Sequence, residues 1–591
     1  MSIVIPARNC RPYLDRCLTA ALVQRVRKEI VVVDDGSTDG TAELLDLYAA
    51  YHRGIVRVVR VEGGTGAGRP RNVGLDHAAG RYVFFCDADD YLGPEALERM
   101  VASADRNGSD IVLGKIVGHG RRAPVSMFHR SADRVELGDS AVYNSLSCFK
   151  LFRRQMLERH RIRFREGLLV GEDIYFTVHA YCHAEAISVV ADHDCYHLVD
   201  RADGSSIMQR PDSRDPVSWL AMIRGPIQLM AEHIPPGKLR DHLLLRHFRL
   251  DAFAQLGTPF LEAGDVQRKN IAQAVAGICD QWLTSGVYQR LSGTDRQRLA
   301  ALGDVDRLVR LADIESAMVR RSLTGLRWDG DRLVVTGTAA LEGVGAHEAV
   351  ALVLRPRQEP GRELVVAAEQ EGDGFTAGID VAALGAGVWD LRVTVELEGV
   401  VRAGRLGADR EGGVARPAPR LIGGVVALPY FTRDNGNLSI DVGGYVVGVP
   451  GNARITRTSW SFGRLVVDGE ITVAGTVPPA SAVRRLVWRE RGSGRERADR
   501  VVALSGGGFV ARPAVGRLSP GTWDAYLELE LGGPPARFRI ETDAATVAAP
   551  RRWLGGIVLR SVRPYATAGK GRLSTVVRRL TARMVFRRIM R

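Results

Sequence analysis

The C-terminal part of this 591-residue chain contains one sequence pattern twice, at a spacing of 134 to 135 residues. GVWDLRVTVELEG at 387–399 returns as GTWDAYLELELGG at 521–533, and PYFTRDNGNLS from 429 returns as PYATAGKGRLS from 564. Apolar and polar residues alternate between glycine-rich turns, which is typical of β-strands. A repeat of this length predicts two copies of one domain. We therefore expect tandem all-β sandwich modules over 319–450 and 451–572.

The first 205 residues have a different pattern, in which short apolar runs alternate with amphipathic helical stretches. SIVIPA, EIVVVDDGS, VRVVRVE and RYVFFCDADD contain the predicted strands, and the first of them lies in place of a signal peptide. This alternation predicts an α/β domain with a largely parallel sheet over 1–205. Residues 206–318 carry apolar residues at spacings of three and four, which predicts a helical connector.

The positive charge is concentrated at the C-terminal end. Residues 551–591 hold eleven arginines, one lysine and no acid, so they account for +12 of the formal net charge of +13. Because the rest is nearly neutral, nucleic-acid binding by the main body is not expected. In the segment 573–591, apolar residues at helical spacing predict a basic amphipathic helix. It would rest on anionic lipid, stay as a solvated end, or dock on an acidic polymer or another subunit.

Two further features concern the cellular compartment and the membrane. The seven cysteines lie in the first half without a CxxC pair, which favours free thiols in the cytoplasm. No window approaches 18 uninterrupted apolar residues, so we predict no transmembrane helix.

The stretch VFFCDADDY at 83–91 places three carboxylates directly after an apolar strand. Crowded carboxylates repel one another unless a cation lies among them, and Mg²⁺ or Mn²⁺ prefers such ligands together with phosphate oxygens. A metal held by Asp87 and Asp89 would neutralise the diphosphate of a nucleotide sugar and improve it as a leaving group. Alone, an Asp-x-Asp triplet is a weak signal.

Other polar motifs flank this turn in a fixed order. VVVDDGS ends a strand with Asp34 and Asp35, RPRN supplies Arg71 and Asn72, and GED opens a predicted helix with Glu172 and Asp173. Since ligands of open α/β sheets bind beyond the carboxyl ends of the strands, these motifs predict one shared site.

The order and wording of these motifs resemble the family 2 glycosyltransferases, inverting enzymes of the GT-A fold with a Rossmann-like mixed sheet. The resemblance covers residues 1 to about 205. It implies that Asp173 is the general base with Glu172 beside it, and that Asp87 and Asp89 hold Mn²⁺ or Mg²⁺, joined by His197. The implied donor-binding residues are Pro6, Ala7, Asp35, Arg71, Asn72, Asp87, Asp90, Arg201 and Ser205.

Each residue also has a structural alternative. Asp34, Asp35 and Asp39 are residue types that cap helices and tighten turns. Glu172 and Asp173 are favourable acids for a first helical turn. A lone histidine such as His197 is more often structural. GGTGAG at 63–68 lacks the full GxGxxG and the lysine of a phosphate-binding loop, and we interpret it as a flexible loop over the donor.

The whole layout resembles the poly(ribitol-phosphate) glycosyltransferases that decorate wall teichoic acid. That resemblance implies immunoglobulin-like C-terminal modules, a homo-oligomer, a UDP-sugar donor and an anionic cell-envelope polymer as acceptor. The enzyme would be a hexosyl- or N-acetylhexosaminyltransferase, cytoplasmic and peripheral on the inner face of the membrane. The alternatives are a non-catalytic polymer-binding scaffold, which would have lost acids, and a polyol-phosphate polymerase, which would need a second domain with histidine motifs.

Overall fold

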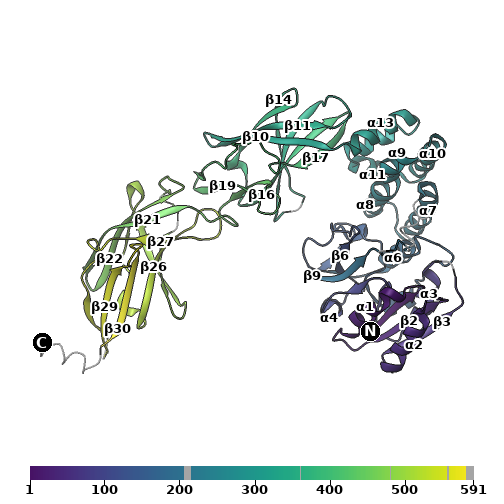
Figure 1. Cartoon of the computed structure of the whole chain (residues 1–591), viewed down its shortest axis with the longest axis horizontal. Coiled ribbons are helices and arrows are strands. Elements are labelled where there is room, and N and C mark those ends of the chain that lie inside the picture. Colours follow the sequence, from purple (N-terminus) through teal and green to yellow (C-terminus); the bar gives the residue numbers. More distant parts are fainter. Residues whose placement is uncertain are drawn as a thin grey trace. The chain divides into compact units, whose positions relative to one another are not determined.

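The chain folds into two compact units, Met1–Ser316 and Ala317–Arg591 (Figure 1). Among the described residues, no helix has the length and the apolar character that a membrane span requires. The computed structural model describes residues 1–64, 66–201, 203–204, 206, 215–359, 361–479, 481–482, 484–555 and 558–580.

A mixed sheet forms the centre of the first unit, with the strand order β3-β2-β1-β4-β8-β6-β9-β5 and with β7 attached to β9. β1 lies between β2 and β4 and is parallel to both, whereas β8 is antiparallel to β4. The apolar runs of β1 and β2 are fully buried, as expected for parallel strands covered on both faces. The predicted α/β domain is confirmed. Its strands are β1 (Ser2–Ala7), β2 (Glu29–Asp35), β3 (Val56–Val61), β4 (Tyr82–Phe85), β5 (Tyr91–Leu92), β6 (Ile111–His119), β7 (Ala132–Val135), β8 (Leu151–Arg153) and β9 (Ile187–Val199).

Helices pack around this sheet, and α6 is anchored by aromatic side chains. Phe85, the last residue of β4, has its ring centroid 4.9 Å from that of Phe164 and 5.3 Å from that of Phe176 on α6. Edge-on packing of this kind fixes the start of α6 relative to the end of β4. The helical elements are α1 (Arg11–Leu22), α2 (Thr41–Tyr51), α3 (Gly68–Asp76), α4 (Ala96–Asn107), η1 (Val142–Asn144), α5 (Arg154–Arg159) and α6 (Glu172–His183).

The predicted helical connector is confirmed, and it completes the first unit. Its first helix, α7, packs against α6 and α10. Leu220, Ile223, Ile227 and Met230 bury one face of α7 at spacings of three and four residues. The connector contains α7 (Pro216–His233), α8 (Lys238–His247), η4 (Phe248–Ala252), η5 (Phe253–Leu256), α9 (Thr258–Glu262), α10 (Asp265–Trp282), α11 (Ser285–Arg290), α12 (Gly293–Ala300) and α13 (Val305–Ser316).

The second unit consists of β-rich modules, as the repeat predicts. In the first module the described strands form separate sheets, β10-β11-β15-β14 and β13-β12-β16-β20-β19-β18, with β17 on β16. Its elements are β10 (Val319–Asp329), β11 (Arg332–Leu341), β12 (Ala349–Pro356), β13 (Leu364–Ala367), β14 (Glu369–Glu371), β15 (Gly374–Asp380), η6 (Val381–Ala383), β16 (Gly387–Leu397), β17 (Val400–Arg405), β18 (Arg420–Ile422), β19 (Val425–Phe431) and β20 (Leu438–Val442).

The second module closes on itself. Its strands follow the path β23-β24-β25-β22-β21-β27-β26, and β26 pairs with β23 to complete a barrel. The immunoglobulin-like form that the resemblance implied is therefore not confirmed. The elements are β21 (Gly451–Ser461), β22 (Arg464–Val473), β23 (Arg484–Glu490), β24 (Glu496–Ala503), η7 (Ser505–Gly507), β25 (Gly508–Ala511), η8 (Val515–Arg517), β26 (Gly521–Leu529), β27 (Ala536–Glu541), β28 (Arg551–Gly555), β29 (Val558–Ala566) and β30 (Leu573–Arg579).

Equivalent side-chain contacts recur in the two modules. In each, an aspartate on a central strand pairs with two arginines from flanking segments, and an indole N–H beside that aspartate donates to a backbone carbonyl four residues earlier. The ion-paired sets are Asp390 with Arg357 and Arg405, and Asp524 with Arg491 and Arg539.

The C-terminal basic helix predicted over 573–591 is wrong for the residues that the structure describes. Residues 573–579 form β30, which pairs with β26 and β29 inside the second module. Leu573 and Val577 are buried in the core of that module, so their apolar character serves the sheet. The predicted helical position Met584 and the rest of 581–591 lie outside the described residues.

Candidate functional site

Acidic residues gather at the carboxyl end of β4, the sheet edge at which β1 and β2 also end. Asp87, Asp89 and Asp90 follow β4 directly, and one carboxylate oxygen from each lies within 4.8 Å of the others. Asp34 and Asp35 are the last residues of β2, which is parallel to β1. The structure thus brings the predicted acids together at the edge where such sheets bind ligands.

A buried arginine links this turn to the start of α6. Arg71 donates from Nη2 to Asp87 Oδ1 (2.6 Å) and from Nη1 to Glu172 Oε1 (2.7 Å). Its side chain is only 4% exposed. Charge-assisted hydrogen bonds are stronger than neutral ones, so Arg71 holds the two carboxylates at a fixed separation. Motifs that are far apart in the sequence are therefore joined by one guanidinium.

The other two acids of the turn are held by β9 and the residues after it. Asp89 accepts a hydrogen bond from Arg201 Nε (2.7 Å), and Asp90 accepts from Tyr196 Oη (2.9 Å) and from the Val199 backbone N–H (2.8 Å). Burial raises the pKa of both carboxyls, and the charge of the neighbouring aspartates raises it further, to about 8 for Asp90. The negative charge of this turn is therefore poorly compensated, which is the condition that a bound cation relieves.

Asp173 lies beside Glu172 in the first turn of α6 and is partly exposed. Burial raises its pKa to about 7, and the charge of Glu172 adds to that effect while Arg71 opposes it. The helix begins after Gly171, whose φ of +94° favours glycine, and a Cβ there would lie 2.4 Å from Met222 Sδ on α7. A carboxylate with a pKa near neutrality is suited to general base catalysis.

Asp35 lies against the glycine-rich loop at 63–68. Its Oδ1 accepts a hydrogen bond from the Gly64 N–H (3.1 Å), and its Oδ2 is 3.5 Å from Arg8 Nη1. Burial raises the pKa of this carboxyl. Thr65 of the loop lies outside the described residues.

Two neighbouring aspartates make the contacts of turn and cap residues. Asp34 Oδ1 accepts from the Ser37 N–H (3.1 Å), and Asp39 accepts from the backbone N–H groups of Thr41 and Arg11 (3.0 Å each). These contacts match the structural alternative for Asp34 and Asp39, in which an aspartate stabilises a turn or a helix start.

Three predicted donor-site residues have positions that follow from β1 and α3. Pro6 and Ala7 end β1, where Ala7 is paired with Asp34 of β2. Asn72 on α3 is buried, and its carboxamide donates to Phe164 O (2.9 Å) and accepts from Phe164 N (2.8 Å). This amide therefore ties α3 to the segment that leads to α6.

Two predicted site residues remain, His197 and Ser205. His197 stacks on Tyr91 with ring centroids 4.4 Å apart, and its Nδ1 is 2.9 Å from Nε2 of His119. Among the described residues it is not part of the group of ligand atoms that Asp87, Asp89 and Asp90 form. Ser205 lies outside the described residues.

Tyr196 is a site residue that the sequence patterns do not reveal. Its hydroxyl accepts a hydrogen bond from the Asp87 N–H (3.0 Å) and donates to Asp90 Oδ2 (2.9 Å). It is buried within β9, where an aromatic residue at a strand position is ordinarily a core residue. Its place in DCYHLV, next to His197, is the one hint that the sequence contains.

The comparisons with known proteins agree with this geometry. Residues 2–161 match the family model described as glycosyl transferase family 2, and residues 216–312 match that of the glycosyl transferase TarS linker domain. The chain is 40% identical over 205 residues to the poly(ribitol-phosphate) beta-glucosyltransferase of Bacillus spizizenii, covering 34% of this chain and 32% of that protein. It is 37% identical over 205 residues to the poly(ribitol-phosphate) beta-N-acetylglucosaminyltransferase TarS of Staphylococcus aureus, covering 34% and 35%.

These matches span about a third of the length of each curated relative. Among solved structures, S. aureus TarS aligns with a TM-score of 0.51 at 21% identity, covering 86% of this chain and 95% of that one. At this identity the likeness concerns the fold, including the connector and the β modules. The N-terminal part of the chain is therefore similar to glycosyl transferase family 2, and the segment after it is similar to the TarS linker domain.

Proposed function

We propose that the chain is an inverting glycosyltransferase that moves a sugar from a UDP-sugar to a hydroxyl of an anionic cell-envelope polymer of the poly(ribitol-phosphate) class. The observation that carries this proposal is the row Asp87–Arg71–Glu172, which joins the acids at the end of β4 to the start of α6, where Asp173 lies. The acids that would bind the donor and the aspartate that would act as base are thereby held at fixed positions relative to one another, as a single displacement requires.

The donor would lie over the sheet edge. Asp35 has an acceptor oxygen beside the 63–68 loop and is suited to the ring N–H of uracil. Asp87, Asp89 and Asp90 offer oxygen donors at close range, and that set suits Mg²⁺ or Mn²⁺. Bound there, the cation would neutralise charge on the leaving diphosphate. Arg201, which pairs with Asp89, is suited to a phosphate oxygen.

Asp173 would act as the base. In its unprotonated form it takes the proton of the acceptor hydroxyl while that oxygen attacks the anomeric carbon from the side opposite the diphosphate. One displacement inverts the configuration, so an α-linked UDP-sugar gives a β-linked product. The names of both relatives specify β-linked transfer, of glucose in one and of N-acetylglucosamine in the other. UDP-glucose and UDP-N-acetylglucosamine are therefore the two donors to test first.

An arginine-lined cavity in the first β module supports an anionic acceptor. The cavity has a volume of about 640 Å³ between β10, β16 and β17, and its charged lining consists of five arginines and one aspartate, Asp409. Burial lowers the pKa of Arg392, and repulsion from neighbouring arginines lowers it further. Within the described structure, Nε of Arg392 and Nε of Arg402 are buried without a hydrogen-bond partner. Phosphate groups in the cavity would offset the excess positive charge of its lining.

The second module indicates that these arginines serve more than the fold. At the positions that correspond through strand pairing to Arg321, Arg392 and Arg402, it carries small or neutral residues. Since that module closes a barrel without them, a ligand is the better reason for their presence in the first. The corresponding residues are Ala453, Tyr526 and Ala536.

The proposal extends to the cellular setting. The positive charge of 551–591 would keep a cytoplasmic enzyme close to anionic lipid or to lipid-linked acceptor at the inner face of the membrane. A homo-oligomer would present several acceptor-binding modules to one polymer chain and raise its effective concentration at the active site.

UDP release tests the proposed function. The full chain is supplied with UDP-glucose or UDP-N-acetylglucosamine, poly(ribitol-phosphate) and Mn²⁺, and Asp173→Asn is compared with Asp46→Asn, an exposed acid on α2 that pairs with Arg60. We expect release with one donor, loss of release in EDTA, and a decrease of about 10²- to 10⁴-fold in Asp173→Asn alone. Donor binding, measured by calorimetry, should be unchanged in that variant. Transfer by Asp173→Asn at the wild-type rate would contradict the proposal, and absence of donor binding by the wild type would favour a scaffold.

A further inference from the structure

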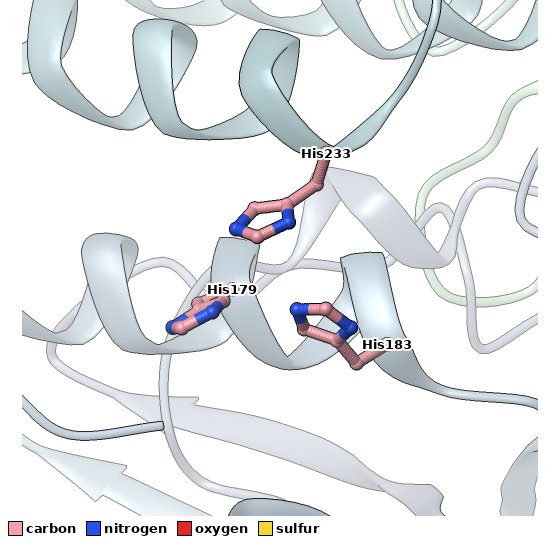
Figure 2. A group of neighbouring side chains, drawn as sticks. All are labelled: His179, His183 and His233. Carbon is pink, nitrogen blue, oxygen red and sulfur yellow. The ribbon is translucent and has the colours of Figure 1, made fainter. Parts of the chain in front are cut away.

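Three histidines from two packed helices meet at one point of the first unit. His179 and His183 lie four residues apart on α6 and so project from the same face, and His233 is the last residue of α7 (Figure 2). The ring centroids are 5.1 Å apart for His179 and His183, 5.0 Å for His179 and His233, and 4.6 Å for His183 and His233.

The ring nitrogens of this histidine cluster (His179, His183 and His233) are arranged as ligands around a common centre. One nitrogen from each ring lies within 4.8 Å of the other two. Zinc binds imidazole nitrogen at about 2.0–2.1 Å, which places the nitrogens of a tetrahedral site about 3.4 Å apart. Binding of an ion would draw the three nitrogens to that spacing.

The nitrogens are also available. In the part of the chain that the structure describes, none of the three imidazoles has a hydrogen-bond partner. His233 is exposed, and His183 and His160, whose rings stack with centroids 4.0 Å apart, line a cavity of about 340 Å³.

We propose that His179, His183 and His233 bind one divalent transition-metal ion, with Zn²⁺ as the expected metal. Three imidazoles without a carboxylate suit Zn²⁺ and are poor ligands for Mg²⁺ or Ca²⁺, which require oxygen. Water or a polar group in the cavity takes the fourth position.

The bound ion links the catalytic helix to the connector. α6 begins with Glu172 and Asp173, whereas His233 ends the first connector helix, α7, which packs on α6. A metal that bridges them cross-links these helices at the last turns of α6, away from the first turn that carries Asp173, and stabilises the folded first unit. The alternative is that the rings merely pack together as neutral side chains, in which case metal has no effect.

Zinc titration of the full chain tests this site independently of any transferase activity. Metal is first removed with a chelator, and excess Mg²⁺ is then added so that the carboxylate cluster does not compete. Wild type is compared with His233→Ala, with His233→Cys, which restores a zinc ligand, and with His129→Ala, an exposed histidine outside the cluster. Calorimetry measures Zn²⁺ affinity, Co²⁺ replacement reports nitrogen ligation through visible absorption bands, and melting curves report stability.

We expect one Zn²⁺ to bind wild type and His129→Ala equally, and the melting temperature of both to rise with Zn²⁺. His233→Ala should bind at least about 100-fold more weakly and show no such rise, because loss of a direct ligand costs at least as much as loss of an outer-shell partner. His233→Cys should retain binding. Wild-type protein that binds no Zn²⁺, or His233→Ala that binds it as wild type does, would overturn the proposal; a misfolded His233→Ala leaves the comparison of His233→Cys with wild type to decide.

Discussion

At the scale of single residues, the acids of the site differ in what surrounds them. Asp87 and Glu172 are paired with Arg71, whereas Asp173 lies next to them with no cation of its own among the described side chains. Burial raises the pKa of Asp173 to about 7, and the charge of Glu172 contributes to that rise. A base must be unprotonated to accept a proton yet basic enough to attract it, and a pKa near neutrality meets both needs.

This environment predicts how transfer depends on pH. Below its pKa Asp173 is protonated and accepts no proton, so kcat/KM should decrease about tenfold per pH unit below about 7. Initial rates of UDP release between pH 5 and 9 measure the profile. An acid limb centred near 3.9, the ordinary value for aspartate, would contradict the role of Asp173. The residual rate of Asp173→Asn should lack the limb, which distinguishes titration of the base from titration of the substrate.

Stability should show the opposite dependence. A carboxyl whose pKa is raised on folding binds its proton more tightly in the folded chain than in the unfolded one. Its contribution to the free energy of unfolding therefore decreases as pH rises from about 3.9 through 7. This pH dependence is the reverse of that for an ion-paired acid. The partly buried position of the Asp173 carboxyl therefore lowers the free energy of unfolding at neutral pH.

The residue types of the site were predictable from the sequence, whereas their contacts were not. Local patterns place DADD after a strand and GED at a helix start, and the resemblance to a known family singles out Asp87, Arg71 and Asp173. That Arg71 bridges two of these motifs, or that Tyr196 bonds Asp90, depends on side-chain directions fixed by tertiary packing.

At the scale of elements, the error over 573–579 is instructive. Leu573 and Val577 are four residues apart, which fits a helix, but Leu573, Thr575 and Val577 also fit a strand with a period of two. The repeat would have decided between them, because LSTVV follows the same PY motif as LSIDV, which forms β20 of the first module. A short apolar run is ambiguous alone, and its equivalent in another copy resolves it.

The position of β30 predicts a sharp boundary for truncation. A chain that ends after Arg572 loses β30, leaves β26 and β29 without a shared neighbour, and removes Leu573 and Val577 from the core. We expect that protein to lose the cooperative unfolding transition of the second module. A chain that ends after Leu580 should keep it. Calorimetry and limited proteolysis of both proteins measure this, and equal stability of the two would mean that β30 contributes nothing.

At the scale of the whole molecule, the repeat made the division into modules predictable and left their specialisation hidden. In the sequence, the arginines of β10, β16 and β17 look like ordinary solvent-facing residues of strands. Only the folded module brings Arg321, Arg392 and Arg402 to one cavity. The same limit applied to the histidine cluster, because its third member, His233, comes from α7, and only the packing of α7 on α6 brings it to His179 and His183.

The arginine cavity predicts a separation of acceptor binding from donor chemistry. The double substitution Arg392→Ala with Arg402→Ala removes two guanidinium groups whose Nε atoms have no partner in the described structure, so little folding stability should be lost. We expect KM for the anionic polymer to rise at least about tenfold, since a hydrogen bond to a charged group contributes about 1.5–3 kcal/mol. UDP release in the absence of polymer should not change. Arg327→Ala, which replaces an exposed arginine on β10, is the matched control.

The wild-type KM for the polymer should also increase steeply with salt concentration, and the KM of the double variant should increase less, because its binding releases fewer counterions. A double variant with the wild-type KM and salt dependence would show that the polymer is held elsewhere.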